Sequence, residues 1–169
     1  IRNAFIPPTA LRMLRAARFI AGYHLQPVPE LVEAVRSLHG RLSIVSAERI
    51  RDELDKLMVV DHPSEGLMFL VDNGVAGEFL PELPAMRLEQ DPIHRHKDVL
   101  THTLAVVENV TRDFPGEYDF RRTRIAALLH DVGKPKTRGF LKGKGVTFHH
   151  HEVVGARMAR QRLQALRYS

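Results

Sequence analysis

Apolar residues recur at helical spacing along most of this 169-residue chain. In residues 11–23, an apolar arc of the helical wheel lies opposite three arginines at three-residue spacing, Arg12, Arg15 and Arg18. The same helical period continues in further segments, namely residues 27–42, 46–59, 63–74, 98–114, 120–133 and 150–166. The pattern therefore predicts an all-α fold.

Capping and helix-breaking residues indicate where several of these helices begin and end. Pro29 stands where a first-turn proline is tolerated, and Ser46 stands where an N-cap is expected. Gly40 and the pair 73–74 (Asn-Gly) suit the C-terminal ends of helices. The prolines of FLPELPAM, residues 79–86, predict an interrupted connector.

A basic segment lies between the last two predicted helices. Gly133 is expected to end the first of these helices, and Pro135 is expected to block its continuation. The residues that follow, 134–148, form a basic loop that contains glycine, and they are compatible with a short hairpin.

Composition narrows the chemistry that the chain can perform. It contains no cysteine, so any metal ion must be held by His, Asp, Glu or water. Lys and Arg outnumber Asp and Glu by 25 to 20, which gives a formal net charge of +5. This surplus suits a polyanionic partner, and it equally fits a basic protein that has none. Because no apolar run is long enough to cross a bilayer and no leader is present, we expect a cytoplasmic protein without a membrane partner.

The strongest chemical signal is LLHDVGKP, residues 128–135. His130 and Asp131 are adjacent at the end of an apolar helix, where both side chains can reach an ion that lies beyond the helix tip. An imidazole and a carboxylate suit a divalent ion such as Mg, Mn, Fe, Ni or Zn. A carboxylate beside such an ion can help to activate water, which makes Asp131 a candidate catalytic residue. Lys134 offers a positive charge for a substrate phosphate and is the second catalytic candidate.

Further histidines lie on two other predicted helices. His102 lies within an apolar helix, where a lone histidine is more often a hydrogen-bonded core residue. The run 149–151 opens the last helix, where surface histidines are the ordinary interpretation. Taken together, the order His, His-Asp, His on three helices favours a divalent-metal site.

This order resembles the HD superfamily of metal-dependent phosphohydrolases. The resemblance is carried by HKDVLTHTL, LLHDVGKP and HHHEVVGA. It implies that His102, His130, Asp131 and His151 hold one or two divalent ions, with His149 as a second candidate in the histidine run. Such families usually supply a last Asp further downstream, which is not found before the end of this sequence. We expect water, another side chain or a residue beyond this sequence to complete the set.

A wider resemblance covers nearly the whole chain. It is carried by blocks in a fixed order: LRMLRAARFIAGYHLQPVPELVEAV, SAERIRDELDKLM, FLPEL and HKDVLTHTL. They resemble the C-terminal part of bacterial CCA-adding tRNA nucleotidyltransferases of the poly(A) polymerase family. The resemblance implies a helical neck and body over residues 1–87 that binds nucleotide and tRNA, and an HD domain over residues 88–169. The implied partners are tRNA and, in the longer protein, ATP and CTP.

The arginine stripe has a functional and a structural interpretation. Arg12 matches an arginine with which that family selects the incoming nucleotide, although Pro8 and Thr9 replace the acidic pair that precedes it there. Arg15 and Arg18 are expected to contact either phosphates or structural carboxylates, and a structural or solvated face is favoured for both.

The family's polymerase head is missing from this sequence. Neither its Gly-Gly-x-x-Arg-type phosphate loop nor its Asp-x-Asp metal pair occurs here. Without those carboxylates, the chain alone is expected not to add nucleotides. The sequence therefore predicts part of a tRNA nucleotidyltransferase with a metal-dependent phosphohydrolase module. The alternatives are a stand-alone HD nucleotide phosphohydrolase and a non-catalytic RNA-binding body.

Overall fold

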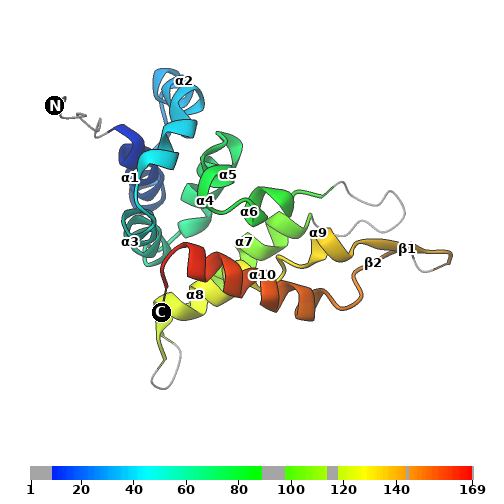
Figure 1. The fold of residues 1–169 in the computed structure, drawn as a ribbon. Coiled ribbons are helices and arrows are strands. Elements are labelled where there is room, and N and C mark those ends of the chain that lie inside the picture. Colours follow the sequence, from blue (N-terminus) through cyan, green and yellow to red (C-terminus); the bar gives the residue numbers. More distant parts are fainter. Residues whose placement is uncertain (1–8, 89–97, 114–117, 144, 169) are drawn as a thin grey trace.

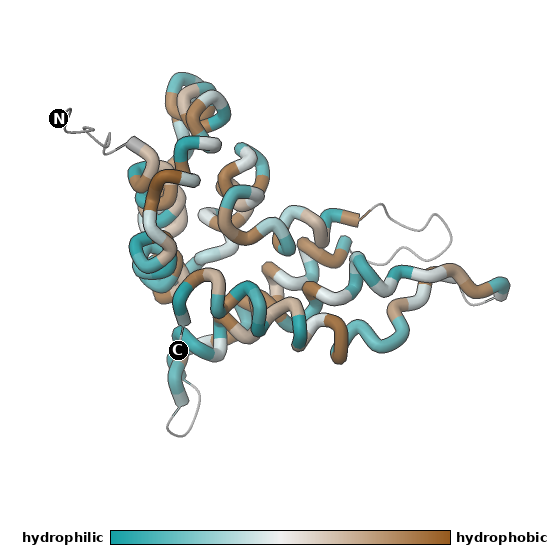
Figure 2. Tube along the Cα trace, in the orientation of Figure 1, coloured by the Kyte–Doolittle hydropathy of each residue, from teal (hydrophilic) through white to brown (hydrophobic). Residues whose placement is uncertain are grey.

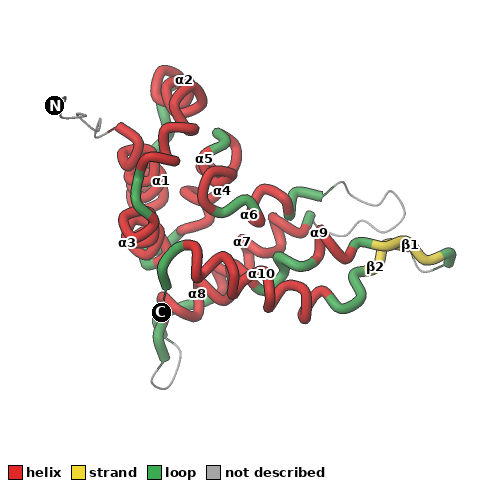
Figure 3. Tube along the Cα trace, in the orientation of Figure 1, coloured by secondary structure: helices red, strands yellow, loops and turns green. Residues whose placement is uncertain are grey.

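A computed structural model describes residues 9–88, 98–113, 118–143 and 145–168 (Figure 1). The first part consists of α1 (Thr9–Tyr23), α2 (Pro29–Leu38), the 3-10 helix η1 (His39–Ile44), α3 (Ala47–Met58), α4 (Pro63–Asp72), α5 (Val75–Phe79) and α6 (Glu82–Ala85). The second part consists of α7 (Val99–Asn109), α8 (Phe120–Leu129), α9 (Lys134–Thr137), β1 (Gly139–Leu141), β2 (Gly145–Thr147) and α10 (His151–Ala165). Figure 3 shows helices throughout and one small hairpin, which confirms the all-α prediction.

Helix α1 forms the centre of the first part, where it packs against α3 and α4. The apolar arc of its helical wheel is buried, as the periodicity predicts: Met13, Leu14, Ala17, Ile20 and Ala21 are all at most 7% exposed. The crossing with α4 is close because Gly66 faces the Ala17 carbonyl, and a Cβ at Gly66 would lie 2.5 Å from that oxygen. Figure 2 shows the same alternation of hydrophobic and hydrophilic positions along the helices of both parts.

The second part is built around α7 and α8, which pack against each other, with the short helix α9 in contact with α10. Its core consists mainly of aliphatic side chains, among them Leu100, Leu104, Val107, Leu128 and Val132. Asp98 and Asp119 cap α7 and α8, because their carboxylates accept hydrogen bonds from the backbone N–H groups of Thr101 and Arg122.

One buried arginine joins the two parts. Arg124 of α8 is 3% exposed, and its guanidinium donates to the carbonyls of Met58 at 3.0 Å and Asp61 at 3.3 Å, at and beyond the end of α3. It also donates to the carbonyl of Val60 and, at 3.1 Å, to that of Val110 beyond the end of α7. These carbonyls lie where helices leave acceptors without intrahelical partners.

A second arginine joins the two parts at another point. Arg162 of α10 forms a two-pronged pair with Glu82 of α6, at 2.8 and 3.0 Å. It also donates to the Phe79 carbonyl at 3.1 Å, so the last helix is held against the end of the first part.

Several predicted helix boundaries are wrong for identifiable reasons. The predicted connector 79–86 is partly helical, because Phe79, Leu83 and Met86 are buried. Pro81 is the N-cap of α6 and Pro84 lies within its single turn, where a proline removes no intrahelical hydrogen bond. Gly40 does not end a helix: α2 ends at Leu38, and η1 continues through the glycine.

Three further predictions concern helix ends in the rest of the chain. Ser46 has the N-cap position of α3, but its side chain makes no capping hydrogen bond. Helix α7 ends at Asn109, short of the predicted 114. Helix α8 ends at Leu129, and Pro135 lies in the first turn of α9 instead of preventing a helix. The compatibility of residues 134–148 with a short hairpin is confirmed by β1 and β2.

Removing the donors of Arg124 should destabilise the whole chain. We expect Arg124→Met to lower the free energy of unfolding by about 3 kcal/mol or more, because several buried carbonyls lose a charged donor. Urea denaturation followed by circular dichroism measures this change. The matched control is Arg122→Gln on the same helix, whose side chain is 77% exposed and pairs with Asp119. It should change the stability by less than about 0.5 kcal/mol, and equal effects of both variants would contradict the proposed role of Arg124.

Candidate metal centre

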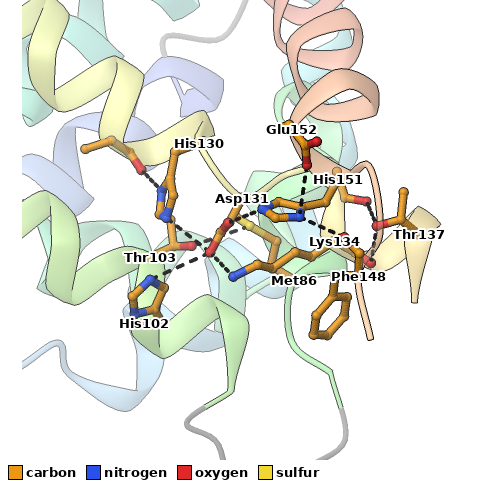
Figure 4. Close-up of polar contacts among 12 residues, drawn as sticks. Met86, His102, Thr103, His130, Asp131, Lys134, Thr137, Phe148, His151 and Glu152 are labelled. Atoms are coloured by element: carbon orange, nitrogen blue, oxygen red, sulfur yellow. Dashed lines mark hydrogen bonds and ion pairs between the residues drawn. The ribbon is translucent and has the colours of Figure 1, made fainter. Parts of the chain in front are cut away.

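Three side chains from two elements converge on one point (Figure 4). His102 lies on α7, while His130 and Asp131 lie in the turn that follows α8, and potential ligand atoms of all three lie within 4.8 Å of one another. Nε2 of His130 lies 3.1 Å and Nε2 of His102 lies 3.7 Å from the same Asp131 oxygen, Oδ2. The apolar pattern of α7 and α8 buries both helices side by side, and this packing brings His102 to the end of α8.

Asp131 is the centre of the cluster. It is 2% exposed, whereas the side chains of His102 and His130 are 48% and 35% exposed. Burial raises the pKa of Asp131, but the hydrogen bonds from His130 and Lys134 outweigh burial and lower this pKa to about 2. The carboxylate is therefore ionised across the physiological pH range.

Backbone carbonyls orient two of the imidazoles. Nδ1 of His130 lies 2.7 Å from the Ala127 carbonyl oxygen, and Nδ1 of His151 lies 2.8 Å from that of Phe148. A carbonyl can only accept, so each Nδ1 carries the proton and each Nε2 faces Asp131. Such an outer hydrogen bond is the usual means of fixing a metal-binding histidine.

The donor set fits a cation. A neutral His130 presents a lone pair on Nε2 to the Asp131 oxygen 3.1 Å away, and two acceptors at this distance repel unless a proton or a metal ion lies between them. Without a metal ion, the proton takes this place, and the hydrogen bond to Asp131 raises the pKa of His130. The residues therefore fit a divalent ion with mixed nitrogen and oxygen ligands.

Two glycines bring the last helix to the site. A Cβ at Gly133 would overlap the His151 carbonyl oxygen and would lie 2.7 Å from the backbone nitrogen of Gly155. Because Gly133 lacks a side chain, the start of α10 can lie against the turn that carries Asp131, while a Cβ at Gly155 would lie 3.2 Å from the Gly133 backbone nitrogen, a tight contact. His151 Nε2 then lies 3.7 Å from the second Asp131 oxygen, Oδ1.

The structure thus separates the predicted metal ligands into groups. His102, His130 and Asp131 lie together, and His151 lies on the opposite oxygen of the carboxylate, outside the 4.8 Å group. His149 is exposed in the turn before α10, and among the described residues no contact joins it to Asp131. The ligand roles of all five residues remain predictions.

Lys134, predicted to contact a substrate phosphate, lies inside the site. Its Nζ is 2.6 Å from Asp131 Oδ2 and 5.8 Å from the centre of the Phe148 ring. Two other residues at the site were not predicted from the sequence. Phe148 holds His151 through its carbonyl, and the Glu152 carboxylate lies 3.4 Å from His151 Nδ1. Their only signal was their position on either side of the histidine run.

The predicted RNA-binding arginines lie on α1, toward the other end of the molecule (Figure 1). Arg15 and Arg18 face the buried carboxylate of Glu53, with Nε to oxygen distances of 3.1 and 3.7 Å. Arg12 is exposed and forms no ion pair with any residue that the structure describes. Within the described helices, none has the length and apolar content that crossing a membrane requires.

Two known families match successive segments of the chain. Residues 24–86 match the family described as the probable RNA- and SrmB-binding site of polymerase A. Residues 99–168 match the HD domain family. A helical RNA-binding region joined to an HD domain with a possible divalent-metal site defines the class of this protein.

Relatives extend over almost the whole chain. It is 35% identical to an A-adding tRNA nucleotidyltransferase of Deinococcus radiodurans, across 93% of this chain and 37% of the relative. It is 34% identical to a CC-adding tRNA nucleotidyltransferase of Thermus thermophilus, across 94% of this chain and 37% of the relative. A multifunctional CCA protein of Actinobacillus pleuropneumoniae is 31% identical, across 94% of this chain and 40% of the relative.

On these matches, the chain resembles the RNA-binding and HD portion of tRNA nucleotidyltransferases of the poly(A) polymerase type. It spans only 37 to 40% of the length of these relatives.

Metal binding to single-site variants tests the ligand set. Asp131→Asn should weaken Mn²⁺ or Ni²⁺ binding by roughly 100-fold or more, since it removes the charged ligand. His151→Ala should weaken binding by roughly tenfold, whereas the matched variant His149→Ala should leave it within about twofold. Isothermal titration calorimetry on the metal-free chain measures all three. A larger loss from His149→Ala than from His151→Ala would reverse the assignment.

Proposed function

We propose that this chain is the RNA-binding and HD portion of an enzyme that adds nucleotides to tRNA 3′ ends, and that its metal centre hydrolyses a phosphoester. The observation that carries the second statement is the buried, ionised Asp131 between His102, His130 and Lys134. The matches to the two families and the names of the relatives support the first.

The residues of the centre divide into two roles. His102, His130, Asp131 and His151 would hold the divalent ion, which supplies a Lewis acid for the phosphate and for water. Three imidazoles and one carboxylate suit Mn, Fe, Ni or Zn better than Mg. Lys134 would bind the substrate phosphate as a point charge once its contact with Asp131 is released.

The first part of the chain would bind tRNA. Arg12 would contact nucleotide or RNA directly, because its guanidinium is exposed. Arg15 and Arg18 would act mainly by holding α1 on α3, because both face Glu53. ATP and CTP would be substrates only of a longer protein that also contains a polymerase head. A cytoplasmic location follows from tRNA as the partner.

Turnover by metal-loaded chain tests the hydrolase proposal. We expect hydrolysis of a 2′,3′-cyclic nucleotide or of a generic phosphatase substrate with at least one of Mn²⁺, Ni²⁺, Zn²⁺ or Mg²⁺. Asp131→Asn should abolish it. Lys134→Met should lower kcat by roughly tenfold or more, because the substrate phosphate loses a positive charge. Its metal affinity should stay equal or increase, because Lys134 no longer competes with the ion for Asp131.

The outcomes separate the alternatives. If no ion supports turnover, or if Asp131→Asn is as active as the unchanged chain, the hydrolase claim is removed and a non-catalytic RNA-binding body remains. A start codon directly before Ile1 in the reading frame would favour a stand-alone HD phosphohydrolase over part of a nucleotidyltransferase.

A further inference from the structure

The hairpin of β1 and β2 projects from the helices (Figures 1 and 3). It presents apolar side chains to solvent. Phe140 is 67% exposed and Leu141 is 43% exposed. Each strand has three residues, and a two-stranded sheet of this length adds little stability by itself. The apolar residues of β1 are therefore not explained by a hydrophobic core.

The register of the hairpin places its apolar residues on separate faces. Phe140 pairs with Val146, and Leu141 pairs with Gly145. Because successive residues of a strand point to opposite faces, Phe140 and Val146 share one face and Leu141 lies on the other. The first face thus combines an exposed aromatic ring with an aliphatic neighbour.

The segment that carries the hairpin is strongly basic. Residues 134–144, KPKTRGFLKGK, contain five lysines and arginines and no acidic residue. Lys136 and Lys142 are exposed, and no carboxylate among the described residues pairs with either. Exposed cations beside an exposed aromatic ring are the combination that binds single-stranded nucleic acid, because the cations follow the phosphates while the ring stacks on a base.

Both ends of the hairpin are attached to the metal centre (Figure 4). On the side of β1, α9 begins with Lys134, whose Nζ lies 2.6 Å from Asp131. On the side of β2, Phe148 follows the strand, and its carbonyl accepts the hydrogen bond from His151. A single strand of nucleic acid bound along the hairpin is therefore led to the cluster of His102, His130 and Asp131.

We propose that the β1–β2 hairpin is a platform for single-stranded RNA that guides a strand to the metal centre. Phe140 stacks on an unpaired base, and Lys136 and Lys142 neutralise phosphates. Single-stranded RNA is favoured over a duplex because the bases of a duplex already stack on one another and leave no free face for the ring. This inference rests on the proposed function, since it assigns an RNA phosphoester as the substrate class of the centre.

Binding of a short oligonucleotide tests the platform. The probe is a fluorescein-labelled single strand of RNA of about eight nucleotides, titrated with the complete chain and followed by fluorescence anisotropy. Phe140→Ala should weaken binding by roughly fivefold or more, the loss of one stacked base. Phe140→Trp should restore it. Lys142→Gln should reduce the slope of log K against log salt by about 0.7.

Leu141→Ala is the matched control, because Leu141 is an exposed apolar residue of the same strand on the other face. It should leave the affinity within about twofold, since it removes no stacking ring. Equal affinity of Phe140→Ala and the unchanged chain, or an equal loss in Leu141→Ala, would overturn the proposal. The proposal would also fail if Phe140→Ala lost binding to phosphatidylserine vesicles but not to RNA, because the hairpin would then be a membrane contact.

Hydrolysis assays separate this inference from the proposed function. If Phe140→Ala binds RNA normally while Asp131→Asn abolishes turnover, the platform is wrong and the hydrolase proposal stands. If Phe140→Ala weakens RNA binding while Asp131→Asn hydrolyses as well as the unchanged chain, the platform stands and the hydrolase proposal is wrong.

Discussion

The buried guanidinium of Arg124 is the contact on which the position of the metal centre depends. It supplies donors to carbonyls at and beyond the end of α3 and beyond the end of α7, where the helices leave acceptors without partners. A cation at helix C-termini also suits the negative end of the helix dipole. Because α8 runs directly from Arg124 to His130 and Asp131, the contact that joins the two parts of the chain also fixes where the carboxylate lies.

The centre itself depends on close backbone approach as much as on its polar residues. Asp131 can remain ionised at 2% exposure because His130 and Lys134 are in direct contact with it. His151 reaches the other carboxylate oxygen because Gly133 lets the backbone of α10 approach the turn that carries Asp131. A side chain at Gly133 would overlap the His151 carbonyl oxygen and move the start of α10, whereas a Cβ at Gly155 would require only a small shift.

Sequence periodicity predicted most helices because their buried faces are long and regular, as in α1. It also indicated His102, His130 and Asp131, which the structure brings together. The short helix α6 escaped because its prolines mask a buried pattern, and α5 escaped because five residues are too few to show a helical period. The role of Arg124 escaped for a different reason: its partners are backbone carbonyls, which leave no trace in the sequence. The one usable sign was its spacing of four residues from Leu128, on the buried face of α8.

The net charge of the chain does not show which of its cations are available to bind RNA. Arg15 and Arg18 face Glu53, Arg162 holds Glu82, and Arg124 is enclosed by carbonyls. The formal charge of +5 therefore says little about where a polyanion binds. What matters is where cations remain exposed without carboxylate partners, and several described residues meet that condition, among them Arg12, Arg41, Arg49, Lys136, Lys142, Arg157 and Arg160. Arg12 lies on α1, ahead of residues 24–86 that match an RNA-binding family, whereas Lys136 and Lys142 lie on the basic segment that leads away from the metal centre. Exposure alone therefore does not single out one RNA-binding surface, and for Lys136 and Lys142 the additional sign is the exposed ring of Phe140 on the same segment.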